Sequence, residues 1–471
     1  MLLTTWLSDA FQWPVWASAC CDGLLVFLLT LHAVEKLFVV QNTGQKIAKE
    51  QAKASDDKAF AHFQRQYLVV YGLVMFADWL QGTHMYSLYQ SYGVNVGTLF
   101  LTGFLSSVVF GNFVGPLVDK YGRRKACLLY CALEVAINIV ENIPIMEVLL
   151  LGRVLGGIST SLFFSAFESW MVTEHRARGF SESLLEKTFA LGSEINGVVA
   201  VLAGLVAQVA ADEFGDIGPF RAAIVVTAIA AAFVLPWSEN YGSLPQAAGK
   251  DAQKKSASEN NKSSSSLCAG AYALGFCYSL FEGAMYVFVF LWYPTLESVV
   301  PDGVVPSGLV FSSFMLCIAI GGKLFDLIEN YWLREELLLV LTTAASAISL
   351  LSSTITDDYQ YILAGFLVFE VCVGVISPCC ATLRSRNWRW QLFEQRPAIL
   401  RMQRCPCHSC GLRCKTGSGL VYPINFTKKA QGAMSMTLLS VVTWSGCARC
   451  RSNNKSSLSL HLFLVFASLA P

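Results

Sequence analysis

Long apolar segments dominate this chain and restrict what it can fold into. A helix that crosses a bilayer needs about 20 predominantly apolar residues, and eleven segments of the sequence reach or approach that length. They are residues 18–40, 67–90, 95–118, 124–141, 145–168, 188–211, 219–237, 268–292, 305–328, 335–353 and 358–378. Only 14% of the residues are charged, whereas a soluble domain has about 25%. The pattern predicts an all-α membrane protein.

The basic residues between these segments predict how the chain is oriented. Lys and Arg cluster in alternate connections, at residues 41–66, 119–125, 169–187 and 238–267. Connections without any Lys or Arg lie between them, at residues 91–94, 142–145 and 293–304. Because basic loops stay on the cytoplasmic side of a membrane, we expect these basic connections in the cytoplasm and the N-terminus outside.

One polar segment divides the chain into two groups of helices. It contains the sequence GKDAQKKSASENNKSSSS, which cannot bury a core and predicts a flexible linker. Six helices precede it after the first polar connection, as in transporters built from two related halves. The expected parts are an extra N-terminal transmembrane helix with a cytoplasmic linker at 1–66, a first half of six helices at 67–237, the flexible cytoplasmic linker at 238–267, a second half with four evident helices at 268–384, and a divergent Cys-rich C-terminal region at 385–471.

The C-terminal region departs from the pattern of the preceding helices. It has no further apolar run of full spanning length, so the second half is expected to be incomplete. Potential zinc ligands occur in it, at Cys405, Cys407, His408, Cys410 and Cys414. Their spacing is irregular and lacks the paired C-x₂-C units of zinc sites. We interpret the region as an aberrant C-terminus, from alternative splicing or a mistaken gene model, and predict no metal and no cofactor.

The connection after segment 95–118 contains a recognisable motif. Its sequence, GPLVDKYGRRK from Gly115 to Lys125, resembles the signature G-x-L-x-D-x-x-G-R-[RK]-[RK] of the major facilitator superfamily. A glycine permits close helix packing or a tight turn, and an acidic residue near a helix end can exchange ion-pair partners between two states. The motif therefore predicts a gate formed by Gly115, Asp119, Gly122, Arg123 and Arg124. An ordinary basic loop beside a membrane would explain the charges alone.

Two internal similarities support parallel halves. The sequence Gly-Lys-Leu-Phe-Asp at 322–326 repeats G-x-L-x-D in the second helix of the second half. The first helices of the halves correspond as well, with Gly-Thr-His-Met-Tyr at 82–86 against Gly-Ala-Met-Tyr at 283–286. Such repeats are typical of facilitator halves. The expected fold is that of the major facilitator superfamily, with two six-helix-type halves and one extra N-terminal helix.

Further motifs resemble one family within this superfamily, the molybdate-anion transporters. They are ADWLQ at 77–81, GRVLGGIST at 152–160, FSAFESW at 164–170, EH at 174–175, ENY at 239–241 and FSSFM at 311–315. The resemblance extends from about Tyr67 to about Arg384, and an extra helix before the core is also a feature of that family. It implies uptake of molybdate, a tetrahedral oxyanion, most simply across the plasma membrane.

Donors inside the apolar segments are candidates for substrate binding. Arg153 is the clearest cation within the first half, and a guanidinium offers an oxyanion a rigid fork of donors. Ser161 lies eight residues later on the same helix face, and Gln81 and Asn196 are further polar candidates. The alternative for Arg153 is a structural ion pair with Glu168 or Glu194. Mid-membrane amides also serve to hold helices together.

Carboxyl groups at membrane depth are costly and usually functional. Because burial favours their neutral form, they can carry a coupling proton. The candidate coupling carboxylates are Asp78, Glu168, Glu194 and Glu282, with hydrogen bonding between helices as the alternative. For Glu134 and Glu370 a structural role is the favoured interpretation.

Together these features predict a secondary active transporter that works by alternating access. A carrier of another small solute such as a sugar, or a sensor that binds without transport, is the alternative. No P-loop and no nucleophile–base arrangement is recognisable, so the chain is not expected to be an enzyme. The net charge of +1 gives no indication of nucleic acid, and the expected partners are a small anionic substrate and the lipid bilayer.

Overall fold

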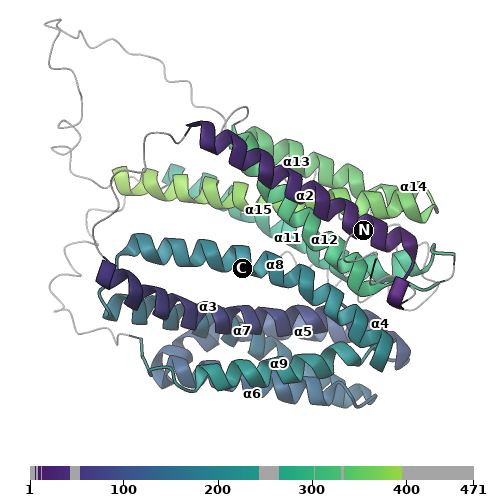
Figure 1. The fold of residues 1–471 in the computed structure, drawn as a ribbon, viewed down its shortest axis with the longest axis horizontal. Coiled ribbons are helices and arrows are strands. Elements are labelled where there is room, and N and C mark those ends of the chain that lie inside the picture. Colours follow the sequence, from purple (N-terminus) through teal and green to yellow (C-terminus); the bar gives the residue numbers. More distant parts are fainter. Residues whose placement is uncertain are drawn as a thin grey trace, which may run out of the picture.

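The computed structural model describes residues 13–42, 54–242 and 265–394, apart from 302 and 330–333, and a few positions nearer the N-terminus. All regular elements in these residues are helices (Figure 1), so the prediction of an all-α protein is confirmed. Most of the expected linker and residues 395–471 lie outside the described residues. The predictions for the linker and for the Cys-rich region therefore stay predictions.

Eleven long helices and two short ones make up this part of the chain. They are α2 (Val15–Asn42), α3 (Ala54–Gly82), α4 (Met85–Ser91), α5 (Val96–Tyr121), α6 (Arg123–Val140), α7 (Met146–Ala177), α8 (Glu182–Phe214), α9 (Gly218–Val234), α11 (Ser265–Glu297), α12 (Ser307–Glu329), α13 (Glu335–Leu350), α14 (Ser352–Ile355) and α15 (Tyr359–Glu394). Each of the eleven apolar segments overlaps one long helix. Eight of the described helices are long and apolar enough to cross a membrane.

The helix ends differ from the expected segment ends in several places. Helix α3 begins at Ala54 instead of residue 67, and α15 continues to Glu394, into the region that was expected to diverge at 385–471. The segment predicted at 67–90 is interrupted, because α3 ends at Gly82 and α4 begins at Met85. The predicted basic connection at 169–187 is almost entirely helical, since α7 and α8 extend into it and leave only residues 178–181 between them. Polar residues at the end of a spanning helix can continue the helix in water, so apolar length underestimates helix length.

The helices pack around two separate cores. In the first bundle, α5 and α6 pack on α7, while α3 packs on α8 and α9. In the second bundle, α12 and α13 both pack on α15. The N-terminal helix α2 packs on α12 and so lies along the second bundle (Figure 1). The described residues thus place six long helices in the first bundle and four in the second, with α2 added to it.

The two bundles meet most closely where α8 crosses α12. The Ser312 hydroxyl donates to the carbonyl of Val201 at 2.9 Å, and the backbone N–H of Gly308 donates to Gln208 Oε1 at 2.9 Å. A Cβ added to Gly204 or Gly308 would overlap the facing helix. Glycine is therefore required at this crossing because the backbones approach too closely for any side chain.

Further contacts between the bundles lie at the end away from the basic connections, which we call the far end. Tyr86 packs on Phe290 and Tyr293 with ring centroids 5.7 and 5.4 Å apart, and Phe104 packs on Tyr286 at 4.8 Å. At the rim, Gln90 Nε2 donates to Glu297 Oε2 at 2.9 Å. These rings close the space between α4, α5 and α11 at the far end.

Candidate functional site

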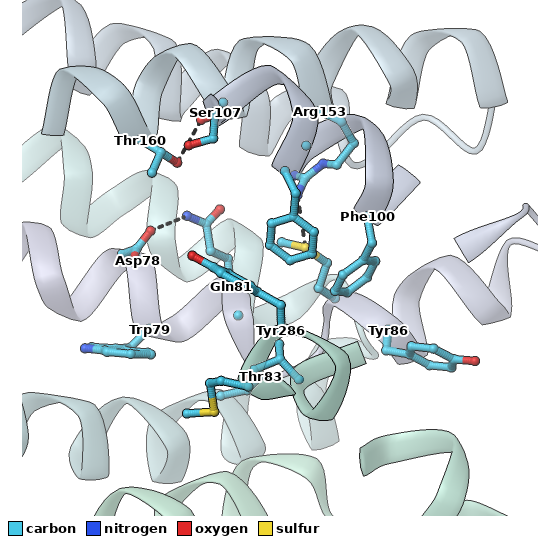
Figure 2. Close-up of a pocket in the computed structure, with 18 of the residues that line it drawn as sticks. Asp78, Trp79, Gln81, Thr83, Tyr86, Phe100, Ser107, Arg153, Thr160 and Tyr286 are labelled. Carbon is cyan, nitrogen blue, oxygen red and sulfur yellow. Dashed lines mark hydrogen bonds between the residues drawn. The ribbon is translucent and has the colours of Figure 1, made fainter. Parts of the chain in front are cut away.

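A cavity of about 750 Å³ lies between the two bundles. Aromatic rings from both bundles form much of its wall, including Trp79, Tyr86, Phe100 and Tyr286 (Figure 2). Trp292 also lines it. Polar side chains are fewer and come mostly from the first bundle: Asp78, Gln81, Thr83, Ser107, Asn112, Glu134, Arg153, Thr160, Ser161 and Ser165. The second bundle adds Glu370 from α15. A mostly apolar cavity with a few convergent polar groups is typical of a small-molecule site.

Half of the eight candidate substrate and coupling residues line this cavity, namely Asp78, Gln81, Arg153 and Ser161. The other four lie elsewhere. Asn196 accepts a hydrogen bond from Trp79 Nε1 at 2.8 Å and so holds a ring of the wall.

The remaining three candidate carboxylates lie away from the cavity wall. Glu168 and Glu194 are exposed on α7 and α8, and Glu282 is half-buried on α11, where the Tyr278 hydroxyl donates to it. Sequence spacing gives no information on which face of a helix meets the other bundle. For this reason only four of the eight candidates line the cavity.

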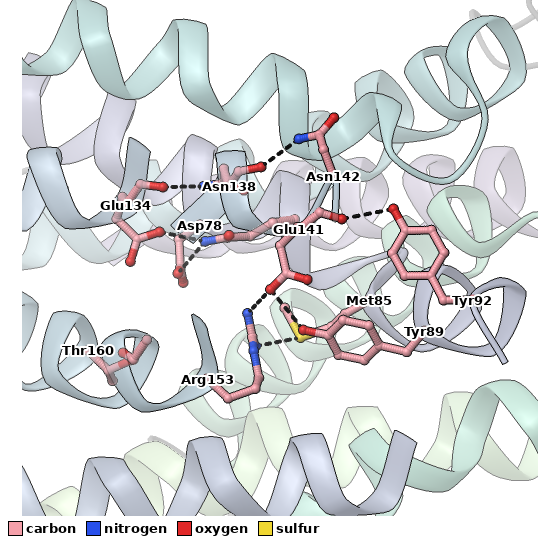
Figure 3. Close-up of polar contacts among 12 residues, drawn as sticks. Asp78, Met85, Tyr89, Tyr92, Glu134, Asn138, Glu141, Asn142, Arg153 and Thr160 are labelled. Carbon is pink, nitrogen blue, oxygen red and sulfur yellow. Dashed lines mark hydrogen bonds and ion pairs between the residues drawn. The ribbon is translucent and has the colours of Figure 1, made fainter. Parts of the chain in front are cut away.

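Arg153 is held in an ion pair at one side of the cavity (Figure 3). Its Nη2 lies 2.6 Å from Glu141 Oε1, and its guanidinium lies 5.6 Å from the ring of Tyr89. The Tyr89 hydroxyl donates to the same carboxylate oxygen at 2.9 Å. The partner of Arg153 is therefore Glu141, and neither Glu168 nor Glu194.

Glu141 follows directly after α6, and sequence reasoning placed it at the membrane boundary. One signal could have identified it. Side chains in a helix lean toward its N-terminus, and Arg153 lies about two turns into α7. The Arg153 side chain therefore leans back toward the short α6–α7 connection, where Glu141 lies.

Part of this buried pair has no partner among the described residues. Arg153 Nε and Glu141 Oε2 are buried without a hydrogen bond there, and the Arg153 Nη1 contact is only to the Met85 sulfur at 3.0 Å. The side chain of Arg153 is 12% exposed and that of Glu141 is fully buried. One edge of the guanidinium is thus fixed by Glu141, and donor capacity remains for a ligand.

A second polar group connects α3, α6 and α7. Glu134 accepts from Ser159 Oγ at 2.6 Å and from Gln81 Nε2 at 3.0 Å. The same Gln81 nitrogen lies 3.5 Å from Asp78 Oδ1. Two carboxyl groups therefore stand on either side of one amide (Figure 3). Sequence reasoning assigned Glu134 to structure and did not connect it with Asp78, because the two helices are far apart in sequence.

The gate motif forms the turn between α5 and α6. Gly122 has a φ of 111°, a left-handed conformation that favours glycine. Asp119 Oδ1 lies 2.7 Å from Arg123 Nη2, with the Asp119 side chain half exposed. Gly115 is not at the tightest point between α5 and α7, since an added Cβ would meet only Ser165 Oγ at 3.8 Å. That point is Gly157, where a Cβ would overlap Ser106 and the backbone of α5.

Residues Glu239 and Asn240, which follow α9, form hydrogen bonds to this turn. The sequence alone did not predict this contact. Glu239 Oε1 accepts from the backbone N–H of Arg124 at 2.9 Å, at the N-terminus of α6. The Asn240 carbonyl accepts from the N–H of Arg123 at 3.0 Å. A carboxylate at a helix N-terminus satisfies donors that have no partner inside the helix. The ENY motif is thus an anchor for the gate turn.

One carboxyl group at the far end has an altered pKa. Asp216, between α8 and α9, accepts from Ser87 Oγ at 3.1 Å. Burial raises the pKa of Asp216, and this hydrogen bond opposes the rise. Asp216 is therefore a titratable group at the far end.

Known proteins resemble this chain over most of its length. A model of a family described as "Sugar-transporters, 12 TM" matches residues 28–375. The molybdate-anion transporter of Xenopus tropicalis is 33% identical over 352 residues, which is 71% of this chain and 75% of that protein. The molybdate-anion transporter of Danio rerio is 33% identical over 402 residues, 78% of this chain and 82% of that protein.

Solved structures show the same fold at low identity. A D-xylose-proton symporter matches with a TM-score of 0.55 and 12% identity, over 87% of this chain and 96% of that one. A nucleoside transporter matches with a TM-score of 0.53 and 12% identity, over 87% and 98%. These relatives and structures are membrane transporters rather than enzymes. The chain is therefore a multi-pass membrane transporter of the major facilitator type, and it belongs to the family of molybdate-anion transporters.

Proposed function

We propose that the protein takes up molybdate across the plasma membrane and that Arg153 binds the anion inside the cavity. The observation that carries the proposal is the position of Arg153, the one cation among the described residues that line the cavity. The names of the relatives support the choice of anion. A tetrahedral oxyanion presents several acceptor oxygens, and a guanidinium binds such acceptors through a fork of N–H donors.

Two hydroxyl groups lie on the same cavity wall as Arg153, about two turns further along α7. Ser161 and Thr160 line the same wall and now donate to backbone carbonyls of their own helix, at 2.8 and 2.9 Å. A hydroxyl proton can rotate to a new acceptor at little cost. In the proposed cycle these hydroxyls turn to the anion while it moves to or from Arg153, and Gln81 and Asn196 keep the shape of the wall.

The cycle we propose is alternating access between two arrangements of the bundles. In the present arrangement the far end is closed by the Tyr86, Phe290 and Tyr293 rings. With the orientation predicted from the basic connections, the far end is extracellular. Opening there requires these rings to separate, and the Asp119–Arg123 turn at the basic end then takes part in closing that side.

A neutral sugar is the second candidate substrate. The aromatic wall formed by Trp79, Tyr86, Tyr286 and Trp292 favours it, because sugars stack on aromatic rings and bond to scattered hydroxyl and amide groups. The description of the matching family points the same way. Arg153 distinguishes the candidates, since a sugar does not need a buried cation.

The test is binding and flux with the purified protein. Radiolabelled molybdate should bind saturably, should be displaced by tungstate, and should be unaffected by excess D-xylose. The protein in proteoliposomes should then take up molybdate saturably. Displacement by the sugar and not by tungstate would replace the proposal with the second candidate, and saturable binding with no flux would identify a sensor.

A further inference from the structure

The start of the N-terminal helix α2 contacts both bundles at the far end. Trp13 and Ala17 are buried there together with Leu309 of α12. Leu205 and Val209 of α8 pack on the same cluster. The rest of α2 packs on α12, and Figure 1 shows that it runs along the second bundle from the end where α4 lies. The start of α2 therefore lies across the boundary between α8 and α12.

One hydrogen bond joins this helix start directly to the first bundle. Trp13 Nε1 donates to Asp212 Oδ2, near the C-terminal end of α8, at 2.5 Å. The other oxygen of Asp212 accepts from Gln208 Nε2 at 2.9 Å. Gln208 Oε1 in turn accepts from the backbone N–H of Gly308 at 2.9 Å. A chain of hydrogen bonds thus runs from the start of α2 through α8 to α12.

The crossing of α8 and α12 must separate when the far end opens. The backbones approach too closely for a Cβ at Gly204 and Gly308, and these residues lie in the far halves of their helices. In alternating access the bundles move largely as rigid bodies. Because α2 packs on α12, Trp13 should move with the second bundle, whereas Asp212 moves with the first. Opening of the far end therefore breaks the bond between them, and closing forms it again.

A simpler role for Trp13 is that of an anchor in the membrane interface. Indole rings are enriched there because the ring is apolar and its N–H is polar. An anchor of this kind exposes its ring to lipid, but Trp13 is only 5% exposed, whereas Trp6 is 62% exposed. Burial between two helices and a carboxylate partner on α8 favour a contact between the bundles.

We propose that the start of α2, residues 13–17, is a strap that holds the far end closed, with Trp13 bonded to Asp212 in the closed arrangement and released in the open one. The extra helix thereby sets how often the carrier opens on that side. The inference rests on the alternating access of the proposed function and does not depend on which solute is carried. Loss of the bond should shift the ratio of open to closed protein by about 2- to 10-fold, as expected for one hydrogen bond.

The experiment measures opening of the far end in the full-length protein in lipid nanodiscs. Spin labels are introduced as non-natural amino acids at Ile143, between α6 and α7, and at Ile355, at the end of α14. Both positions are exposed, and they belong to different bundles. Double electron–electron resonance then gives the ratio of open to closed arrangements. Trp13→Phe keeps an aromatic ring but lacks the N–H donor, and it should raise this ratio about 2- to 10-fold. Trp6→Phe, the matched control, should keep the native ratio.

A double-variant cycle identifies the bond itself. Asp212 is exposed, so Asp212→Ala should fold, and it should raise the ratio at least as much as Trp13→Phe. The two changes together should have no more effect than Asp212→Ala alone, because both remove the same bond. A native ratio in either variant, or additive effects of the two, overturns the strap.

Added molybdate separates failure of the strap from failure of the proposed function. If molybdate changes the ratio of open to closed protein while Trp13→Phe does not, alternating access stands and only the strap is wrong. If the distance between the labels stays the same in every variant, with and without molybdate, the proposed alternating access is overturned together with the strap.

Discussion

Replacing Arg153 by lysine separates anion binding from structural support. The guanidinium now makes a 2.6 Å contact with Glu141 through Nη2, while Nε has no acceptor among the described residues. A lysine ammonium is a single point of charge. It can remain beside Glu141 or reach the anion, but it cannot form both sets of bonds at once. Arg153→Lys should therefore fold and lose affinity for molybdate.

The size of the loss follows from the bonds that lysine cannot replace. A hydrogen bond to a charged group contributes about 1.5–3 kcal/mol, and each 1.4 kcal/mol changes affinity about tenfold. Affinity for molybdate should therefore fall by about 10- to 150-fold. Arg153→Gln is less informative, because it leaves the fully buried Glu141 carboxylate without a counter-charge, which costs about 3–5 kcal/mol of stability.

The matched control removes both charges of the pair. The double variant Arg153→Gln/Glu141→Gln has no isolated charge, so it should fold while binding no molybdate. The assay is equilibrium binding of radiolabelled molybdate at constant pH, with the thermal unfolding midpoint of each variant as the measure of folding. A folded Arg153→Lys variant with native affinity would remove Arg153 from the site. The donors would then be sought near Ser161, Gln81 and Asn196.

Three further expectations concern the gate, the closed end and the orientation. Asp119→Asn removes a half-exposed ion pair and should cost less than about 1 kcal/mol of stability. The flux of molybdate should nevertheless fall at least tenfold, or ~1.4 kcal/mol in the barrier. Native flux in this variant would refute a gating role. The side-chain tips of Gln90 and Glu297 meet at 2.9 Å, so cysteines at these two positions should be bridged by a short bifunctional methanethiosulfonate reagent. The bridge should stop transport until a reductant cleaves it, and full flux through the bridged protein would contradict the closure. A glycan acceptor site introduced into 238–267 should stay unmodified in cells, whereas a glycan there would reverse the predicted orientation.

The positions of the helices could be predicted because the constraint that sets them is local. Spanning a bilayer requires an apolar run of defined length, and every such run overlaps a long helix here. The turn at Gly122 could also be predicted, since only a glycine readily adopts its φ of 111°. The full lengths of α7 and α8 could not be predicted, because the residues that extend these helices are polar and do not continue the apolar run.

The cavity could be predicted only in part, because it is built from helices that are far apart in sequence. Arg153 and Ser161 share one face of one helix, and that relation follows from helix geometry. The pairing of Arg153 with Glu141 and of Gln81 with Glu134 depends on which helices are neighbours. A single sequence contains no record of such neighbours, and so Glu141 was missed and Glu134 was assigned to structure.

In the proposed complex, the Arg153–Glu141 pair allows one cavity to serve both binding and release of the anion. A buried guanidinium without a counter-charge would be unstable in the empty carrier, and Glu141 supplies that charge at 2.6 Å. An anion that binds Arg153 must therefore compete with a fixed internal carboxylate, and this competition lowers its affinity. A carrier benefits from the loss, because a substrate bound too tightly leaves too slowly for transport.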